Sequence, residues 1–164
     1  MSTVKKSIEV AAPLKKVYNQ WTQFEDFPTF MAGVEEVQQL DAKNLRWKVS
    51  VAGVDRSFDT EIIEQEPDCR IAWRTEDGED HTGAVTFEAL GDDATRVNVV
   101  MSYRPENWVE KVGDAANIID LRVQKDLERF KELIEDETLE TGAWRGRIQG
   151  RRIEEDDPAP NTPS

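Results

Sequence analysis

The segment NWVEKVGDAANIIDLRVQKDLERFKELIE, residues 107–135, keeps a helical repeat of apolar residues for longer than any other part of this chain. Its apolar positions recur every three or four residues, at Val112, Ala116, Ile119, Val123, Leu127, Phe130 and Ile134. At about 3.6 residues per turn these positions share one side of a helix, and polar residues take the other. Asn107 followed by Glu110 resembles a capping box at the helix start. The spacing therefore predicts a long amphipathic helix with one buried face.

Such a helix needs a partner wider than another short helix. At its rise per residue it would be roughly 40 Å long, and a sheet is the natural surface to cover its apolar side. Leu121 falls on the polar side of the helix, so we expect this side chain to be exposed.

The residues before this helix predict one strand, two short helices and then a run of strands. Residues 3–10 alternate as a strand does, and residues 13–21 show apolar positions at helical spacing after Pro13. Residues 24–31 hold three phenylalanines around Pro28 and predict a second short helix or a pair of turns. From residue 34 to residue 103 the apolar period is two, and residues 34–40 break strict alternation as a β-bulge would.

Short connections between strands make neighbouring strands antiparallel. The predicted fold class is therefore α+β, with about seven strands in one curved antiparallel sheet, two short helices after the first strand, and the long helix at the C-terminal end. Because a curved sheet encloses more space than one helix fills, we expect a cavity between them, with the short helices at its mouth.

The amino-acid composition disfavours several classes of partner and site. The 164 residues suffice for one domain, and the net charge of −13 disfavours binding to nucleic acid or to anionic membranes. Cys69 is the only cysteine, so neither an internal disulfide nor a cysteine metal cluster is available. No segment has a signal-peptide core or the apolar length of a membrane span. We expect a soluble cytoplasmic protein with no metal, no cofactor and no integral membrane association; its oligomeric state stays open.

Several short motifs carry a family resemblance. They are Phe24-Glu-Asp-Phe-Pro-Thr-Phe-Met31, Val34-Glu-Glu-Val37, Trp47 with Val51-Ala-Gly53, Phe58-Asp-Thr-Glu-Ile62, Pro67 with Ile71-Ala-Trp73, Gly83-Ala-Val-Thr-Phe87, Thr95-Arg-Val97, Tyr103-Arg-Pro105, Leu127-Glu-Arg-Phe-Lys131 and Thr141-Gly-Ala-Trp-Arg-Gly146. Over residues 3–146 the chain resembles the polyketide cyclase/dehydrase and lipid transport family of the START-related (SRPBCC) superfamily. The resemblance implies a helix-grip fold with a ligand cavity, in a family that groups aromatase/cyclases with binders of lipids and quinones.

Alternation places a set of large side chains on the strand face that should meet the helix: Trp47, Phe58, Trp73, Phe87, Met101 and Tyr103. Together with the cavity that the resemblance implies, they predict an aromatic-lined site for a flat or greasy ligand. The full candidate binding set adds Phe27, Phe30, Thr60, Thr75, Val85, Val112, Ala116 and Ile119. The alternative is that these residues form an ordinary core.

Two functions are consistent with these residues. The favoured one is binding of a hydrophobic small molecule, such as a lipid, an isoprenoid or an aromatic polyketide, in the cavity. The rival is a polyketide aromatase/cyclase or dehydratase, in which Tyr103 and His81 would be the catalytic proton-transfer groups. His81 either shares the inward face of its strand or is an imidazole at a loop edge. A third class, an adaptor of another macromolecule, would need an exposed apolar or basic patch, which is not evident outside the tail.

Cyclases of the family are thought to orient their substrate through inward arginine and tyrosine side chains. Alternation sets Arg46 opposite Trp47 and Arg74 opposite Trp73, so both arginines should face outward. Arg104 is opposite Tyr103, whereas Arg56 shares the parity of Phe58 but lies at the start of its strand, near a turn. The interior is therefore predicted to be short of cations, which disfavours cyclase chemistry.

The predicted domain spans residues 1–140, and residues 141–164 form a tail. Arginines at 145, 147, 151 and 152 precede an acidic and proline-rich end, a composition typical of disorder beyond residue 147. Trp144 offers an alternative, in which the start of the tail docks on the acidic body.

Overall fold

The computed structural model describes residues 2–51, 54–75, 81–103, 112–136, 144–149 and 152–154. In chain order the elements are β1 (Ser2–Val10), α1 (Leu14–Trp21), the 3₁₀ helix η1 (Phe24–Thr29), β2 (Val34–Gln39), β3 (Asn44–Val51), β4 (Val54–Glu66), β5 (Arg70–Thr75), β6 (His81–Gly91), β7 (Ala94–Tyr103), α2 (Val112–Glu135), β8 (Arg147–Gln149) and β9 (Arg152–Glu154). From β1 to α2, the order of strands and helices is the one predicted from the sequence.

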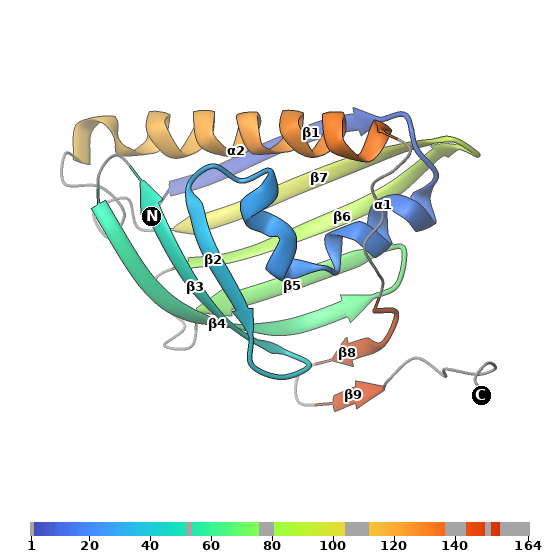
Figure 1. Ribbon diagram of the computed structural model, residues 1–164, viewed down its shortest axis with the longest axis horizontal. Helices are drawn as coiled ribbons and strands as arrows, with labels where there is room; N and C mark the ends of the chain where they lie inside the picture. The colour runs from blue at the N-terminus through green and yellow to red at the C-terminus, as the bar shows by residue number, and fades with distance from the viewer. Residues whose placement is uncertain are drawn as a thin grey trace.

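Seven strands form one antiparallel sheet in the order β1-β7-β6-β5-β4-β3-β2. The sheet curls beneath α2, which runs alongside β1, while α1 and η1 lie within the curl (Figure 1). This arrangement confirms the α+β prediction of a curved sheet around a long helix. The predicted irregularity in residues 34–40 is also present, because the β2–β3 register shifts between Val34 and Glu36.

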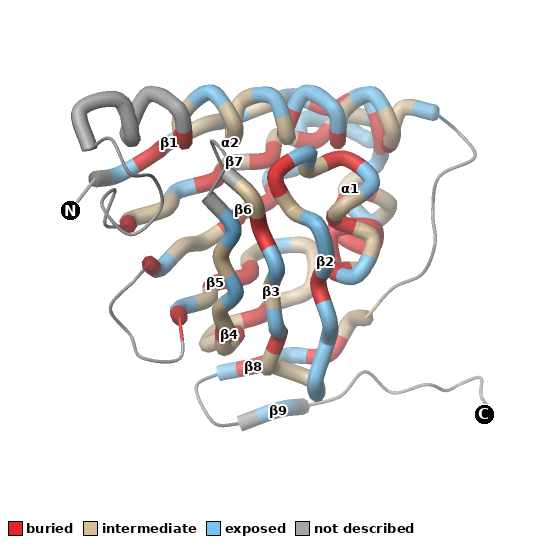
Figure 2. The backbone as a smooth tube through the Cα atoms, turned by 60° about the vertical axis from the view of Figure 1, so that its left-hand side comes forward, coloured by how far each residue is buried: buried red, intermediate tan, exposed pale blue. Residues whose placement is uncertain are grey.

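The buried stripe of α2 has the predicted phase. Leu127, Phe130 and Ile134 are buried, whereas Leu121 is 57% exposed. The Phe130 ring lies 4.9 Å from the Trp21 ring and 5.2 Å from the Phe30 ring, so α2 packs on both short helical segments. Figure 2 shows buried residues recurring along the side of α2 that faces the sheet. The predicted capping residues, Asn107 and Glu110, lie outside the described residues.

A strand that composition did not predict extends the sheet at β4. The pairing of β3 with β4 stops at Glu61, and β8 takes over the same edge through Gln65 opposite Ile148. Ile148 is fully buried and is part of the hydrophobic core, so β8 contributes to that core. A three-residue strand whose partner lies about 80 residues away leaves no periodic signal in the sequence.

Two residues, Trp144 and Arg145, attach this segment to the body of the fold. The Arg145 guanidinium donates to the Asn19 Oδ1 and to the Asp68 carboxylate, both at 2.6 Å. The Trp144 backbone N–H donates to the Thr22 hydroxyl at 3.0 Å. The docking of Trp144 that the sequence left open is therefore present, and β9 pairs with β8 beyond it.

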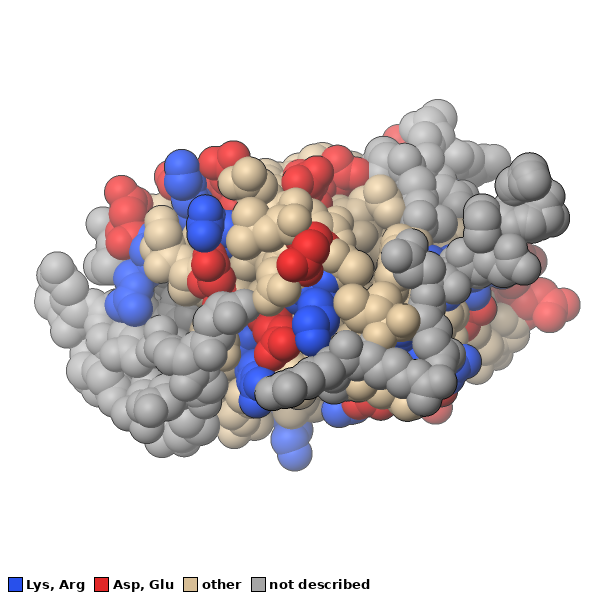
Figure 3. Space-filling view, turned by 90° about the horizontal axis from the view of Figure 1, so that it is seen from below, with Lys and Arg blue, Asp and Glu red and all other residues tan. Residues whose placement is uncertain are grey.

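The outward face of the sheet carries paired charges. The strand register sets Arg46 opposite Asp59 and Arg74 opposite Glu61, and both pairs are salt bridges, at 3.0 and 3.1 Å. Seen from below, acidic and basic side chains are intermixed on the surface (Figure 3). The predicted outward direction of Arg46 and Arg74 is confirmed. Neither α-helix in the described part of the chain is long and apolar enough to cross a membrane.

Candidate functional site

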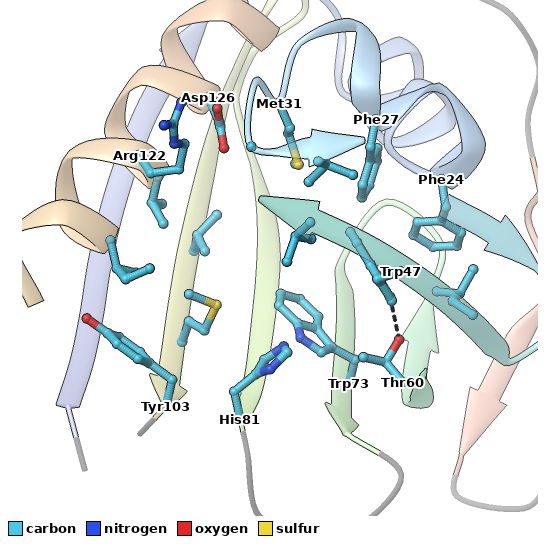
Figure 4. Close-up of a pocket in the computed structure, with 18 of the residues that line it drawn as sticks. Phe24, Phe27, Met31, Trp47, Thr60, Trp73, His81, Tyr103, Arg122 and Asp126 are labelled. Atoms are coloured by element: carbon cyan, nitrogen blue, oxygen red, sulfur yellow. Dashed lines mark hydrogen bonds between the residues drawn. The ribbon is translucent and has the colours of Figure 1, made fainter. Parts of the chain in front are cut away.

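A cavity of about 190 Å³ lies between the inner face of the sheet, η1 and α2. Among the described residues, most of its lining is apolar and aromatic, and the lining side chains that carry a hydroxyl or an ionisable group are those of Thr60, His81, Tyr103, Arg122 and Asp126. Figure 4 shows lining residues contributed by both the strands and α2. The predicted cavity between sheet and helix is therefore present in the fold.

Aromatic rings from neighbouring strands form one side of the cavity. The Trp47 and Phe58 rings, opposite each other in the β3–β4 register, are nearly parallel at 8° with centroids 6.1 Å apart. The Trp47 indole Nε1 donates to the Thr60 hydroxyl at 2.8 Å, which fixes the ring orientation (Figure 4). Trp47 is thus a rigid surface suited to a flat ligand.

Trp73 owes its position to a glycine on the next strand. Gly83 is opposite Trp73 in the β5–β6 register, and a Cβ placed on Gly83 would lie 2.4 Å from the Trp73 Cζ2. The indole therefore lies directly across the β6 backbone, where only glycine leaves room for it.

The structure divides the predicted binding set between cavity and core. The predicted residues that line the cavity are Phe27, Trp47, Phe58, Thr60, Trp73, Met101, Tyr103 and Ile119. The side chains of Val112 and Ala116 lie outside the described part. The lining residues that were not in the predicted binding set are Trp21, Phe24, Met31, Gly33, Val34, Leu45, Val49, Ile62, Ile71, Val99, Arg122, Val123, Asp126 and Leu127.

Four predicted binding residues are buried outside the cavity lining: Phe30, Thr75, Val85 and Phe87. Phe87 lies under α1, where its ring meets Tyr18 at 5.3 Å, and Phe30 packs on Phe130. The Thr75 hydroxyl lies 3.4 Å from both the backbone N–H and the carbonyl oxygen of His81. All four side chains are buried, and for Phe30, Phe87 and Thr75 a helix or a strand end already fills the neighbouring space.

His81 and Tyr103 are direct neighbours across two strands. The β6–β7 register pairs them, and both are buried and line the cavity. The His81 ring meets the Phe58 ring edge-on at 5.4 Å, so the inward alternative for this imidazole is the one observed. The Tyr103 hydroxyl has no hydrogen-bond partner among the described residues. Burial, and to a lesser extent the Asp120 carboxylate, raises the pKa of this phenol, which keeps it a proton donor at neutral pH.

The helix adds a charged pair that the sequence analysis missed. Arg122 and Asp126 lie one turn apart on α2, and both line the cavity (Figure 4). Their Nε and Oδ1 atoms are buried and have no hydrogen-bond partner in the described part of the chain. The expectation of an interior short of cations is corrected here, because it considered arginines on or beside the strands and not those on the helix. The available signal was position, since each follows an apolar stripe residue, Ile119 or Val123, by three.

Neighbouring backbone holds this pair in place. A Cβ on Gly33 would come within 3.4 Å of the Arg122 Nε, so the arginine side chain packs against that glycine. The Asp126 carboxylate accepts a hydrogen bond from the backbone N–H of Ala32. Burial raises the pKa of Asp126 to about 6, and the Arg122 guanidinium, this hydrogen bond and the Arg129 charge oppose that rise.

Comparison with known proteins agrees with this geometry. Residues 10–132 match the family described as polyketide cyclase / dehydrase and lipid transport. The chain belongs to this family. A curated relative from Streptomyces lincolnensis, described as an uncharacterized 17.2 kDa protein, is 49% identical over 149 residues, which cover 90% of this chain and 99% of the relative.

Solved structures share the fold of this family member. A protein from Deinococcus radiodurans is 28% identical with a TM-score of 0.64, over 82% of this chain and 98% of its own. The Zhui aromatase/cyclase from Streptomyces sp. R1128 is 17% identical with a TM-score of 0.62, over 83% and 92% respectively. The latter likeness concerns the fold alone.

Proposed function

We propose that this member of the family binds a small, largely apolar molecule in the cavity between the sheet and α2. The observation that carries the proposal is the cavity itself, about 190 Å³ of space lined chiefly by apolar and aromatic side chains. Apolar cavities of about 150 Å³ already hold a molecule the size of benzene.

Aromatic lining favours a ligand with a flat ring system, such as an aromatic polyketide, over a flexible chain. An aromatic group buries roughly 200 Å². At about 25 cal/mol per Å² this burial contributes on the order of 5 kcal/mol. By itself that corresponds to a dissociation constant of about 0.1 to 1 mM. Tighter binding needs polar groups that fix the ligand.

The family description supports the same class of ligand, because it joins polyketide cyclases and dehydrases with lipid transport proteins. One protein with this fold is an aromatase/cyclase. Lipids, isoprenoids and aromatic polyketides are therefore the ligands to examine first, by native mass spectrometry of gently purified protein.

A matched pair of variants on α2 tests the proposal. Val123 lines the cavity, whereas Leu121 is exposed two residues away on the same helix. Titration with N-phenyl-1-naphthylamine, an uncharged fluorescent probe, should show saturable binding. Val123→Phe should weaken this binding at least tenfold because the added ring fills the cavity, and Leu121→Phe should leave it unchanged. Equal affinities for both variants, with native thermal unfolding curves, would contradict binding in the cavity.

The pairing of His81 with Tyr103 favours a second candidate, a polyketide aromatase/cyclase or dehydratase. A protonated phenol beside an imidazole, both lining the cavity, provides a hydrogen-bond donor for a substrate carbonyl and a second side chain of the kind that serves as a general acid or base.

A further inference from the structure

Arg122 and Asp126 carry two polar atoms at the cavity whose hydrogen bonds are incomplete. The Arg122 Nε and the Asp126 Oδ1 are buried, and among the described residues neither has a hydrogen-bond partner. The free-energy cost of burying a polar group without its hydrogen bonds is larger for a charged group than for a neutral one. A group on a bound molecule would complete both at once, because the two residues lie on successive turns of α2.

The chemistry of the two atoms narrows what that group can be. A guanidinium N–H only donates, and a carboxylate oxygen only accepts. A hydroxyl, an enol or a primary amide does both, whereas a carboxylate or phosphate on the ligand would have its negative charge beside Asp126. The hydrogen bond from the Ala32 backbone N–H goes to the other oxygen of the Asp126 carboxylate. Oδ1 therefore remains available to a ligand.

We propose that Arg122 and Asp126 select and orient the ligand by binding one uncharged donor–acceptor group, a hydroxyl, enol or amide, while its apolar remainder lies against Trp47 and Trp73. This inference rests on the proposed binding function and names the polar end of the ligand. It predicts that ligands ending in a carboxylate or phosphate bind more weakly than their hydroxyl counterparts.

Three flat probes of one ring system test the inference: 2-naphthol, naphthalene and 2-naphthoate. At about pH 8 the phenol is uncharged and the naphthoate is charged, and Asp126, with a pKa of about 6, is ionised. Isothermal titration should show 2-naphthol binding about tenfold or more tightly than naphthalene, since each of its hydrogen bonds is to a charged group. 2-Naphthoate should bind more weakly than 2-naphthol.

Variants assign the preference to the pair. Arg122→Met should bring the affinities for 2-naphthol and naphthalene within about threefold of each other, and the ratio of the two affinities is the readout because the variant also changes the apolar lining. Asp126→Asn, which keeps the shape and removes the negative charge, should increase 2-naphthoate affinity about tenfold. Glu132→Gln removes an exposed charge from the same helix and should change none of these ratios. Thermal unfolding of each variant checks that the fold is intact.

The outcomes separate this inference from the function on which it rests. Equal binding of 2-naphthol and naphthalene that neither variant alters would overturn the role of the pair and leave the binding cavity in place. Tighter binding of 2-naphthoate than of 2-naphthol by the unaltered protein would overturn it too, by showing a carboxylate site. Binding of none of the three probes would contradict the proposed function and this inference with it.

Discussion

Tyr103 is the residue on which the choice between binder and enzyme depends most directly. Its hydroxyl is buried in the cavity lining, and its raised pKa keeps it protonated. Tyr103→Phe removes only that hydroxyl. In an enzyme it should lower turnover while ligand affinity stays within about tenfold; in a binder it should change affinity slightly and nothing else. Product analysis with candidate polyketides measures turnover, and a fluorescence titration measures ligand affinity. Unchanged product formation would remove Tyr103 from catalysis.

Asp126 should make the stability of the protein depend on pH in an unusual direction. Its pKa of about 6 in the fold is above the value near 4 of an unfolded chain, so the folded state binds more protons between these values. Stability from this group is fully present below about pH 4 and is lost as pH rises through 6. Asp126→Asn should therefore raise the free energy of unfolding at about pH 8 by roughly 1 kcal/mol, after allowance for partial solvent exposure.

Urea melts of the Asp126→Asn variant and the unaltered protein at several pH values measure this difference. It should shrink to nothing below about pH 4, where both side chains are neutral. Glu132→Gln, on the exposed face of α2, should show no such trend. A difference that is constant across the range would show that the side chain acts through packing and not through its charge.

At the scale of elements, one glycine in β6 gives the cavity its shape. Gly83→Ala places a methyl group where the Trp73 indole now lies, 2.4 Å from its Cζ2, so the ring must move. We expect overpacking to reduce stability by about 1 to 3 kcal/mol. We also expect N-phenyl-1-naphthylamine affinity to fall, because the displaced indole narrows or reshapes the cavity.

Gly91 offers a control in the same strand, since a Cβ there would meet nothing within 4 Å. Gly91→Ala should leave both the urea midpoint and probe affinity nearly unchanged. An unaltered tryptophan emission spectrum and unaltered affinity in Gly83→Ala would show that β6 yields instead of the indole.

At the scale of the whole molecule, β8 and the residues just before it pack against the body of the fold. Ile148 is fully buried beside β4, and Arg145 joins α1 to the turn after β4 through Asn19 and Asp68. Truncation after residue 143 should therefore lower the free energy of unfolding by at least about 3 kcal/mol, the scale of losing one buried isoleucine. Truncation after residue 154 should have a much smaller effect. Urea melts that coincide for the two truncated forms would place the domain boundary before β8.

Local periodicity was enough to predict the sheet, the long helix and the direction of most side chains. Trp47 and Trp73 face inward and Arg46 and Arg74 outward because successive strand residues alternate, whatever the rest of the chain does. Leu121 is exposed because the helix has 3.6 residues per turn. These features follow from geometry within a few residues of each position, which is what a sequence pattern records.

Only the tertiary structure decided which inward residues meet the cavity. Phe87 and Trp73 share a face, yet α1 covers the first while the second faces open space, because the sheet curls away from α2 by amounts that no local pattern encodes. Arg122 and Asp126 lie on the flank of the apolar stripe, where a neighbour determines burial. The β8 strand depends on an edge of β4 that β3 leaves uncovered about 80 residues earlier. Periodicity fixed the direction of each side chain, and contacts between distant segments fixed what it meets.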